Sequence, residues 1–121
     1  MDDGRPLFLQ IAEQIESSII DGSVPEETQV PSTNELSAFH RINPATAAKG
    51  INQLVAAGVL YKKRGIGMFV RRGARAQILE RRRETFTDLY VRPLLAEAAR
   101  IGLDSRDVAK LIEVTEDREL R

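Results

Sequence analysis

The chain has 121 residues, of which 42% are hydrophobic and 30% are charged, and its formal net charge is zero. This length and composition are typical of one globular domain, alone or with a small appendage. The chain contains no Cys, which excludes disulfide bonds, thiolate chemistry and Cys-based zinc sites, and no apolar stretch approaches the ~20 residues of a membrane span, so we expect no membrane partner.

The first 22 residues predict one amphipathic helix. The opening MDDGRPLFLQ has no basic stretch followed by an apolar run, so it does not resemble a secretory signal and we expect a cytoplasmic protein. Between residues 6 and 21 apolar residues recur at helical spacing, and Gly22 ends the pattern. This apolar stripe consists of Leu7, Ile11, Ile15 and Ile19, with Phe8 and Ala12 beside it.

A second, short helix should begin after a loop, at Ser32. Ser32 and Glu35 have the spacing of a capping box, and Leu36 and Phe39 begin an apolar face. The helix should end near Phe39 or His40. We expect three aromatic residues to lie in the core rather than on a stacking surface, namely Phe8, Phe39 and Phe69.

A third helix should follow after about three residues. Asn43 is placed to cap it, and Pro44 suits its first position because the missing N–H costs nothing there. Gly58 is placed to end it. Its buried stripe should be formed by Ala47, Ile51, Leu54 and Val55. Two helices with so short a connection are typical of a helix-turn-helix.

A β-hairpin should follow the third helix. The sequence VLYKKRGIGMFV predicts strands near 59–63 and 67–71, with Gly65 and Gly67 at the tip. Helix, helix-turn-helix and hairpin in this order predict a winged helix-turn-helix over residues 1–73, within a mainly α (α+β) fold.

The charges are unevenly distributed along the chain. Residues 1–60 hold 8 acidic and 3 basic side chains, whereas residues 61–83 hold 9 basic and 1 acidic. Such a basic patch is the footprint expected of a nucleic-acid-binding surface, although a solvated charged face is the common alternative. The stretch RRGARAQILERRR could extend a phosphate-binding track, but we favour a solvated helix face for residues 81–83.

The remaining residues, 74–121, predict a short helical region. A helix should run from Ala74 to Gly102, with a kink or break near Arg92 caused by Pro93, and Asp104 should cap a last helix. Two helices of this length cannot bury their apolar stripes on each other alone, so we expect a homodimer with a helical interface. The predicted dimerisation residues are Leu79, Phe86, Leu89, Tyr90, Leu94, Val108, Leu111 and Ile112.

Several stretches carry a family resemblance that covers about residues 6–71. VPSTNELS, INPATAAKGINQLVAAGVL and RGIGMFV resemble the GntR family of bacterial transcription regulators, and PLFLQIAEQIESSIIDG fits the first helix of that family. The Asn43-Pro44 pair and the short helical tail are similar to the YtrA subfamily, which usually carries a brief two-helix dimerisation region. The resemblance implies a transcription regulator, with transporter operons as frequent targets.

The chain departs from the family pattern at three places. The family usually has Arg where this chain has Asn34 and often has Arg where it has Ala48. The wing motif, usually Gly-x-Gly-Thr, reads Gly65-Ile66-Gly67-Met68.

The predicted DNA contacts follow from the chemistry of the side chains. Ala45 and Thr46 are short enough for the backbone to approach base edges, and Thr46 can bond a base or a phosphate. Asn43 should cap its helix and could also bond an adenine, while Ser32 can cap, hold a phosphate, or do both. Asn34 could contact a phosphate or a base. The predicted DNA-binding residues are Ser32, Thr33, Asn34, Asn43, Ala45, Thr46, Lys49, Lys62, Lys63, Arg64, Gly65 and Gly67.

These observations predict a homodimeric repressor that binds a palindromic operator in double-stranded DNA. The alternative is a winged-helix module that binds a protein through the same surface. An enzyme is not supported, because His40 is the only His and the chain offers no metal, cofactor or nucleophile–base constellation. A small-molecule effector of unknown identity could bind between the tail helices or at the dimer interface.

Overall fold

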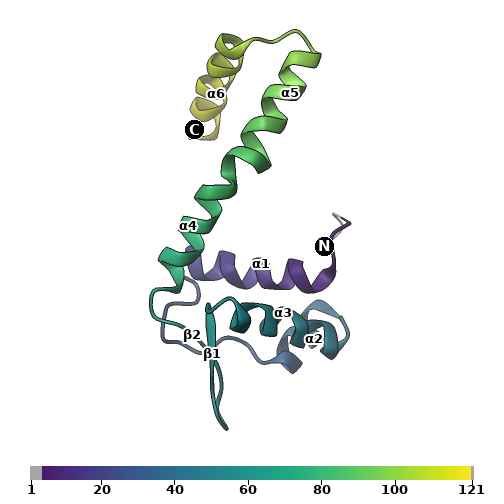
Figure 1. Cartoon of the computed structure of the whole chain (residues 1–121), viewed down its shortest axis with the longest axis vertical. Helices are drawn as coiled ribbons and strands as arrows, with labels where there is room; N and C mark the ends of the chain where they lie inside the picture. Colours follow the sequence, from purple (N-terminus) through teal and green to yellow (C-terminus); the bar gives the residue numbers. More distant parts are fainter. Residues whose placement is uncertain (1–3, 121) are drawn as a thin grey trace. The chain divides into compact units, whose positions relative to one another are not determined.

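The computed structural model describes residues 4–120 (Figure 1). The chain forms two compact units, one extending to Glu80 and one beginning at Arg81. The first three residues of the segment MDDGRPLFLQ lie outside the described residues. No helix within residues 4–120 is long and apolar enough to cross a membrane.

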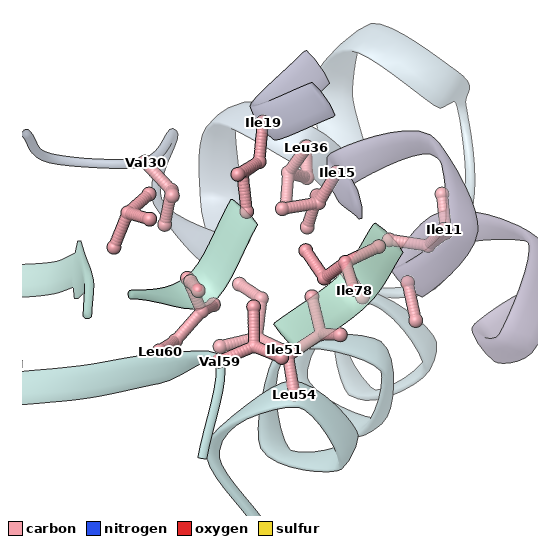
Figure 2. Close-up of a cluster of buried hydrophobic side chains, with 14 residues drawn as sticks. Ile11, Ile15, Ile19, Val30, Leu36, Ile51, Leu54, Val59, Leu60 and Ile78 are labelled. Carbon is pink, nitrogen blue, oxygen red and sulfur yellow. The ribbon is translucent and has the colours of Figure 1, made fainter. Parts of the chain in front are cut away.

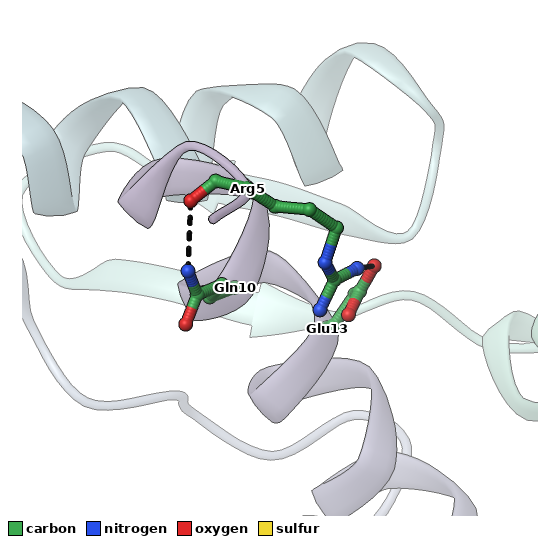
Figure 3. A network of polar contacts seen from close by, with 3 residues as sticks. All are labelled: Arg5, Gln10 and Glu13. Carbon is green, nitrogen blue, oxygen red and sulfur yellow. Dashed lines mark hydrogen bonds and ion pairs between the residues drawn. The ribbon is translucent and has the colours of Figure 1, made fainter. Parts of the chain in front are cut away.

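Helix α1 spans Leu7–Ile20 and is anchored at its start by polar contacts. Gln10 is buried, and its amide Nε2 donates a hydrogen bond to the carbonyl oxygen of Arg5 at 2.8 Å. The guanidinium of Arg5 also pairs with the carboxylate of Glu13 (Figure 3). These contacts fix the residues that precede α1, where Pro6 supplies no side-chain cap.

Helices α2 (Thr33–His40) and α3 (Pro44–Ala56) form the predicted helix-turn-helix. Ser32 and Glu35 make the expected capping box at the start of α2. After α3, Gly58 adopts a φ of 78°, and the N–H of Val59 donates back to the carbonyl of Leu54 at 2.9 Å. This pattern ends α3 as a Schellman motif and turns the chain toward the hairpin.

The hairpin consists of antiparallel strands β1 (Leu60–Lys63) and β2 (Gly67–Val70), within one residue of the predicted bounds. Leu60 pairs with Val70 and Lys63 with Gly67. The loop before α2 adds a one-residue edge to this sheet, because Gln29 forms an isolated antiparallel bridge with Phe69 of β2. Sequence periodicity did not predict this edge, since a single bridged residue leaves no alternating pattern.

The core lies among α1, α2, α3 and the base of the hairpin (Figure 2). It includes Ile11, Ile15 and Ile19 from α1, together with Leu36, Ile51 and Leu54 from the helix-turn-helix. The expectation that Phe39 belongs to the core is wrong, because its side chain is 82% exposed. Helix α2 turns only Leu36 fully inward, and Phe39 lies outside the cluster.

Helix α4 (Ala74–Phe86) begins inside this first unit. Ala74 and Ile78 are almost completely buried and belong to the same hydrophobic cluster. The compact first unit therefore continues past residue 73 to Glu80, because the first turns of α4 supply part of its core.

The second unit contains the end of α4, a π-helical turn η1 (Thr87–Val91), α5 (Arg92–Arg100) and α6 (Ser105–Glu119). Pro93 stands in the first turn of α5, so the interruption predicted near Arg92 takes the form of a π-turn rather than a break. Gly102 and Asp104 end α5 and cap α6 as predicted. The helices α5 and α6 pack through buried Ala98 and Val108.

Candidate nucleic-acid interface

The start of α3 presents an exposed surface of short side chains. The Oδ1 atom of Asn43 accepts a hydrogen bond from the N–H of Ala45 at 2.8 Å, so the side chain of Asn43 caps the helix. Ala45 and Lys49 are exposed, whereas Thr46 and Ala48 are half-buried. The Asn43 carboxamide is thus committed to capping through Oδ1, while its amide nitrogen can still donate to a ligand.

The same end of α3 shares a hollow with the start of α1. The hollow has a volume of about 410 Å³ and is lined by Leu7, Phe8, Ala45, Thr46 and Lys49. The Nζ atom of Lys49 lies 4.2 Å from the ring centroid of Phe8, which is a cation–π contact. Phe8 therefore holds the ammonium group of Lys49 on the α1 side of the helix.

Two amide side chains on the exposed face of α3 were missed by the sequence reasoning. Asn52 and Gln53 are both exposed. Asn52 lies seven residues after Ala45, which places it on the same helix face about two turns further along. An exposed Asn can read adenine in a major groove. The seven-residue spacing from Ala45 is the signal that could have identified Asn52.

The start of α2 lies close to the tip of the hairpin. The N–H of Glu35 donates to Ser32 Oγ at 3.1 Å, so the hydroxyl oxygen of Ser32 is engaged in the cap. A hollow of about 300 Å³ is lined by Ser32, Thr33 and Asn34 on one side and by Ile66 and Gly67 on the other. The fold thus brings these predicted contacts of α2 and the wing to one place.

The wing tip is held by Gln29. Its amide Nε2 donates to the carbonyl oxygen of Ile66 at 3.0 Å. Gly67 has a φ of 148°, and a Cβ at this position would overlap the Gln29 amide. Gly65 has a φ of 79° with open space around it, so its role is conformational. Positive φ favours glycine at both positions, and at Gly67 a Cβ would also meet the flexible end of the Gln29 side chain, which would have to move.

The basic residues of the wing differ in their surroundings. Lys62, Lys63 and Arg64 are all exposed. The Nζ atom of Lys63 lies 4.1 Å from the ring centroid of Phe69, whereas Lys62 points to the opposite face of the hairpin because successive side chains alternate. Within residues 4–120, Lys62 and Arg64 have no hydrogen-bond or ion-pair partner, so their charges are available to a ligand.

Tyr61 ties the wing to the loop before α2. Its hydroxyl donates to Glu27 Oε2 at 3.0 Å, and desolvation together with this hydrogen bond raises the pKa of Tyr61. Arg71 lies over the Tyr61 ring, with its guanidinium carbon 5.5 Å from the ring centroid. Two residues of the basic patch, Lys63 and Arg71, therefore also stabilise the wing.

Glu26 joins the same loop to the start of α4. Its Oε2 atom accepts from the N–H of Arg75 at 3.0 Å, and backbone hydrogen bonds from Arg75 and Gly73 lower the pKa of Glu26. The Nε atom of Arg75 donates to the carbonyl of Ile20 at 2.9 Å. The Arg75 guanidinium is thus used within the fold.

The predicted dimerisation residues lie mostly on the surface of the second unit. Phe86, Leu89 and Tyr90 are more than half exposed around the π-turn. A second apolar surface is a groove of about 540 Å³ between α5 and α6, whose lining includes Leu94, Leu111 and Ile112. Val108 differs, because it is already buried against α5 within the chain. Leu79 is half-buried.

Comparison with known protein families gives a match over the first unit. The family model described as bacterial regulatory proteins, gntR family, matches residues 7–70. The HTH-type transcriptional repressor YtrA of Bacillus subtilis (strain 168) is 27% identical over 75 residues, which cover 62% of this chain and 58% of YtrA. Among the curated relatives, the share of the relative's own length that is matched ranges from 16% to 88%.

Solved structures resemble both parts of the chain. A GntR-family transcriptional regulator from Bacteroides thetaiotaomicron is 30% identical, with a TM-score of 0.75 and coverage of 93% of this chain and 98% of that one. AraR(DBD), solved in complex with operator ORX1, is 33% identical with a TM-score of 0.54, covering 58% of this chain and 84% of that one. These similarities include the winged helix in both cases.

Proposed function

Because this chain belongs to the gntR family of bacterial regulatory proteins, and is therefore a DNA-binding transcription regulator, we propose that it is a repressor that binds a palindromic operator as a homodimer. The observation that carries the proposal is the start of α3, where Asn43 caps the helix and the first turn carries exposed Pro44 and Ala45 beside half-buried Thr46. Small side chains allow a recognition helix to approach base edges closely.

The residue roles follow from the surroundings of each side chain. Thr46 and Asn52 would read bases from α3, because neither belongs to its buried stripe; Asn52 is exposed and Thr46 is half-buried. Thr33 and Asn34 would contact phosphate at the start of α2, with Ser32 as the cap. Lys62 and Arg64 would hold phosphates beside the wing, whose glycine tip allows close approach.

The homodimer is supported by the exposed apolar surface of the second unit. Six large apolar side chains around η1, α5 and α6 are close to half exposed or more: Phe86, Leu89, Tyr90, Leu94, Leu111 and Ile112. Large exposed apolar surfaces often mark sites of protein–protein contact. A two-fold axis would place the same surface of each copy in one interface and would present two recognition helices to two half-sites.

Repression is supported by YtrA, which is named a repressor, and by AraR(DBD), which was solved with an operator. A transporter operon as the target, and an effector bound in the groove between α5 and α6, extend this proposal. The groove is apolar and of a size that could hold a small molecule.

Selection from random duplex DNA with the purified full chain tests the function. We expect enrichment of an inverted repeat whose half-sites are separated by about 10 bp or a multiple of it. Affinity for the enriched sequence should fall steeply with salt, with a log–log slope of about −0.9 for each phosphate neutralised. A shallow salt dependence with no enriched sequence would favour the protein-interaction module instead.

A further inference from the structure

Arg41 occupies a backbone conformation that side chains normally avoid. Within residues 4–120, Arg41 and Glu27 are the non-glycine residues with positive φ, and Arg41 has φ 55° and ψ 49°. This left-handed conformation is needed for the turn between α2 and α3. The N–H groups of Arg41 and Ile42 both return to the carbonyl of Ser37, and Ile42 packs against the core. Glycine would serve the turn with less strain.

The side chain of Arg41 makes no described interaction within its own unit. It is exposed, and among the described residues it has no hydrogen-bond or ion-pair partner. The hydrogen bonds to Ser37 account for the backbone conformation, but they do not account for an Arg side chain at a position where Gly would serve. A sparsely populated backbone conformation in a switch or binding region is a reason to look for a ligand.

The helix-turn-helix has little other positive charge. Between Thr33 and Ala56 the Lys and Arg residues are Arg41 and Lys49, and the ammonium of Lys49 already contacts Phe8. Arg41 is thus the cation of this motif that no described side chain engages. It lies two residues before Asn43, the cap of α3, and so stands beside the end of α3 that would enter the groove.

We propose that Arg41 binds a phosphate of the DNA backbone at the entry of the recognition helix. A guanidinium can hold two phosphate oxygens at once, which fixes the position of α3 in the groove as well as adding charge. Asn34 in α2 and Ala48 in α3 carry no charge, so Arg41 supplies a positive charge that these positions do not. This inference rests on the proposed DNA-binding function.

The test compares Arg41→Gly, Arg41→Lys and Arg41→Gln in the full chain, using the DNA sequence selected by the unmodified protein. Arg41→Gly should leave the Tm unchanged or raise it by a few degrees, because the strain is relieved. The same variant should weaken DNA binding roughly tenfold. The slope of log affinity against log salt concentration should become shallower by about 0.9 for each Arg41 that contacts a phosphate. Affinity would then fall with no loss of stability, a result that loss of folding cannot produce.

The remaining variants separate charge from strain. Arg41→Gln should weaken binding as Arg41→Gly does, and Arg41→Lys should retain most of the salt slope because it keeps the charge. Arg106→Gln, which removes one exposed charge from α6, is the matched control and should leave affinity unchanged. The loss should be uniform across operator variants, and a loss confined to one base pair would overturn the phosphate contact.

Two kinds of failure are distinguishable. If the unmodified chain selects no sequence, the proposed function fails. If the unmodified chain binds its operator and the Arg41→Gly and Arg41→Gln variants bind it with the same affinity and salt slope, the inference about Arg41 alone is wrong.

Discussion

Gly50 allows α3 to cross α1 at close range. A Cβ at position 50 would lie 2.8 Å from the carbonyl oxygen of Phe8 and 3.1 Å from Cγ2 of Ile11. The first of these atoms belongs to the backbone of a helix and cannot rotate away. The hollow that holds Lys49 against Phe8 lies next to this crossing.

We expect Gly50→Ala to lower the free energy of unfolding by about 1–3 kcal/mol, because the overlap outweighs the higher helix propensity of Ala. Equilibrium unfolding in urea measures the change. Gln53→Ala, on the exposed face of the same helix, is the control and should change stability by less than about 0.5 kcal/mol. An unchanged urea midpoint for Gly50→Ala would mean that α1 and α3 accommodate the added methyl group with no loss of stability.

Glu26 makes stability depend on pH. The N–H of Arg75 is the main cause of its lowered pKa, followed by the N–H of Gly73 and the charges of Arg72 and Arg75. Because the pKa is lower in the folded chain than in the unfolded one, the carboxylate stabilises the fold above the unfolded pKa. This contribution is lost as the pH falls through the folded pKa.

We therefore expect Glu26→Gln to lower the Tm near neutral pH and to have little effect at a pH below the folded pKa. Thermal unfolding of both chains over a series of pH values measures the difference. A Tm difference that stays constant across the series would assign the effect to the shape of the side chain rather than to its charge.

Local residue roles were predictable from the sequence, and longer-range ones were not. The caps at Ser32 and Asn43 depend on hydrogen bonds to residues two or three positions away, so the sequence pattern predicts them directly. Phe39 was expected in the core from its spacing alone, but α2 turns only one residue fully inward. Whether an apolar residue at the edge of a helix stripe is covered depends on its neighbours in space.

At the scale of the element, the wing is shaped by a residue outside it. Gln29 lies 37 positions before Ile66, whose carbonyl it binds, and it occupies the space that a side chain at position 67 would need. The hairpin tip is therefore positioned from the loop before α2. The sequence predicts the glycines of the tip but not the Gln29 side chain that lies against one of them.

We expect Gln29→Ala to weaken DNA binding by about three- to tenfold with little loss of stability, because the tip loses one exposed hydrogen bond. Gly67→Ala should give a similar defect, and its effect should be smaller in the Gln29→Ala background, where the overlap is removed. Binding titrations on the selected operator measure both. Strict additivity would show that the two residues act independently.

The π-turn η1 is a second element whose form the sequence does not predict. Pro93 lacks the N–H that would continue the helical hydrogen bonds, so an interruption near Arg92 follows from the sequence. The backbone can meet this loss by a kink, a break or a wider turn. The observed wider turn at Thr87–Val91 carries the exposed residues Leu89 and Tyr90.

At the scale of the whole molecule, the exposed apolar surface of the second unit is the proposed dimer interface. We expect Leu111→Glu to raise the dimer dissociation constant about 30-fold or more, since each substitution occurs twice in a two-fold interface. Operator affinity should fall with it. Sedimentation measures the first change, and Lys110→Ala is the neighbouring control. A Leu111→Glu chain that remains dimeric would place the interface elsewhere.

The sequence by itself determined the order of the elements, the caps, the helix-turn-helix with its wing, and the family, because these depend on periodicity and on contacts between near neighbours in the chain. The tertiary structure decided three further features: the burial of Ile78 in the first unit, the stacking of Lys49 on Phe8, and the hold of Gln29 on the wing tip. These contacts join residues far apart in the chain, and only the packing of the folded chain brings such residues together.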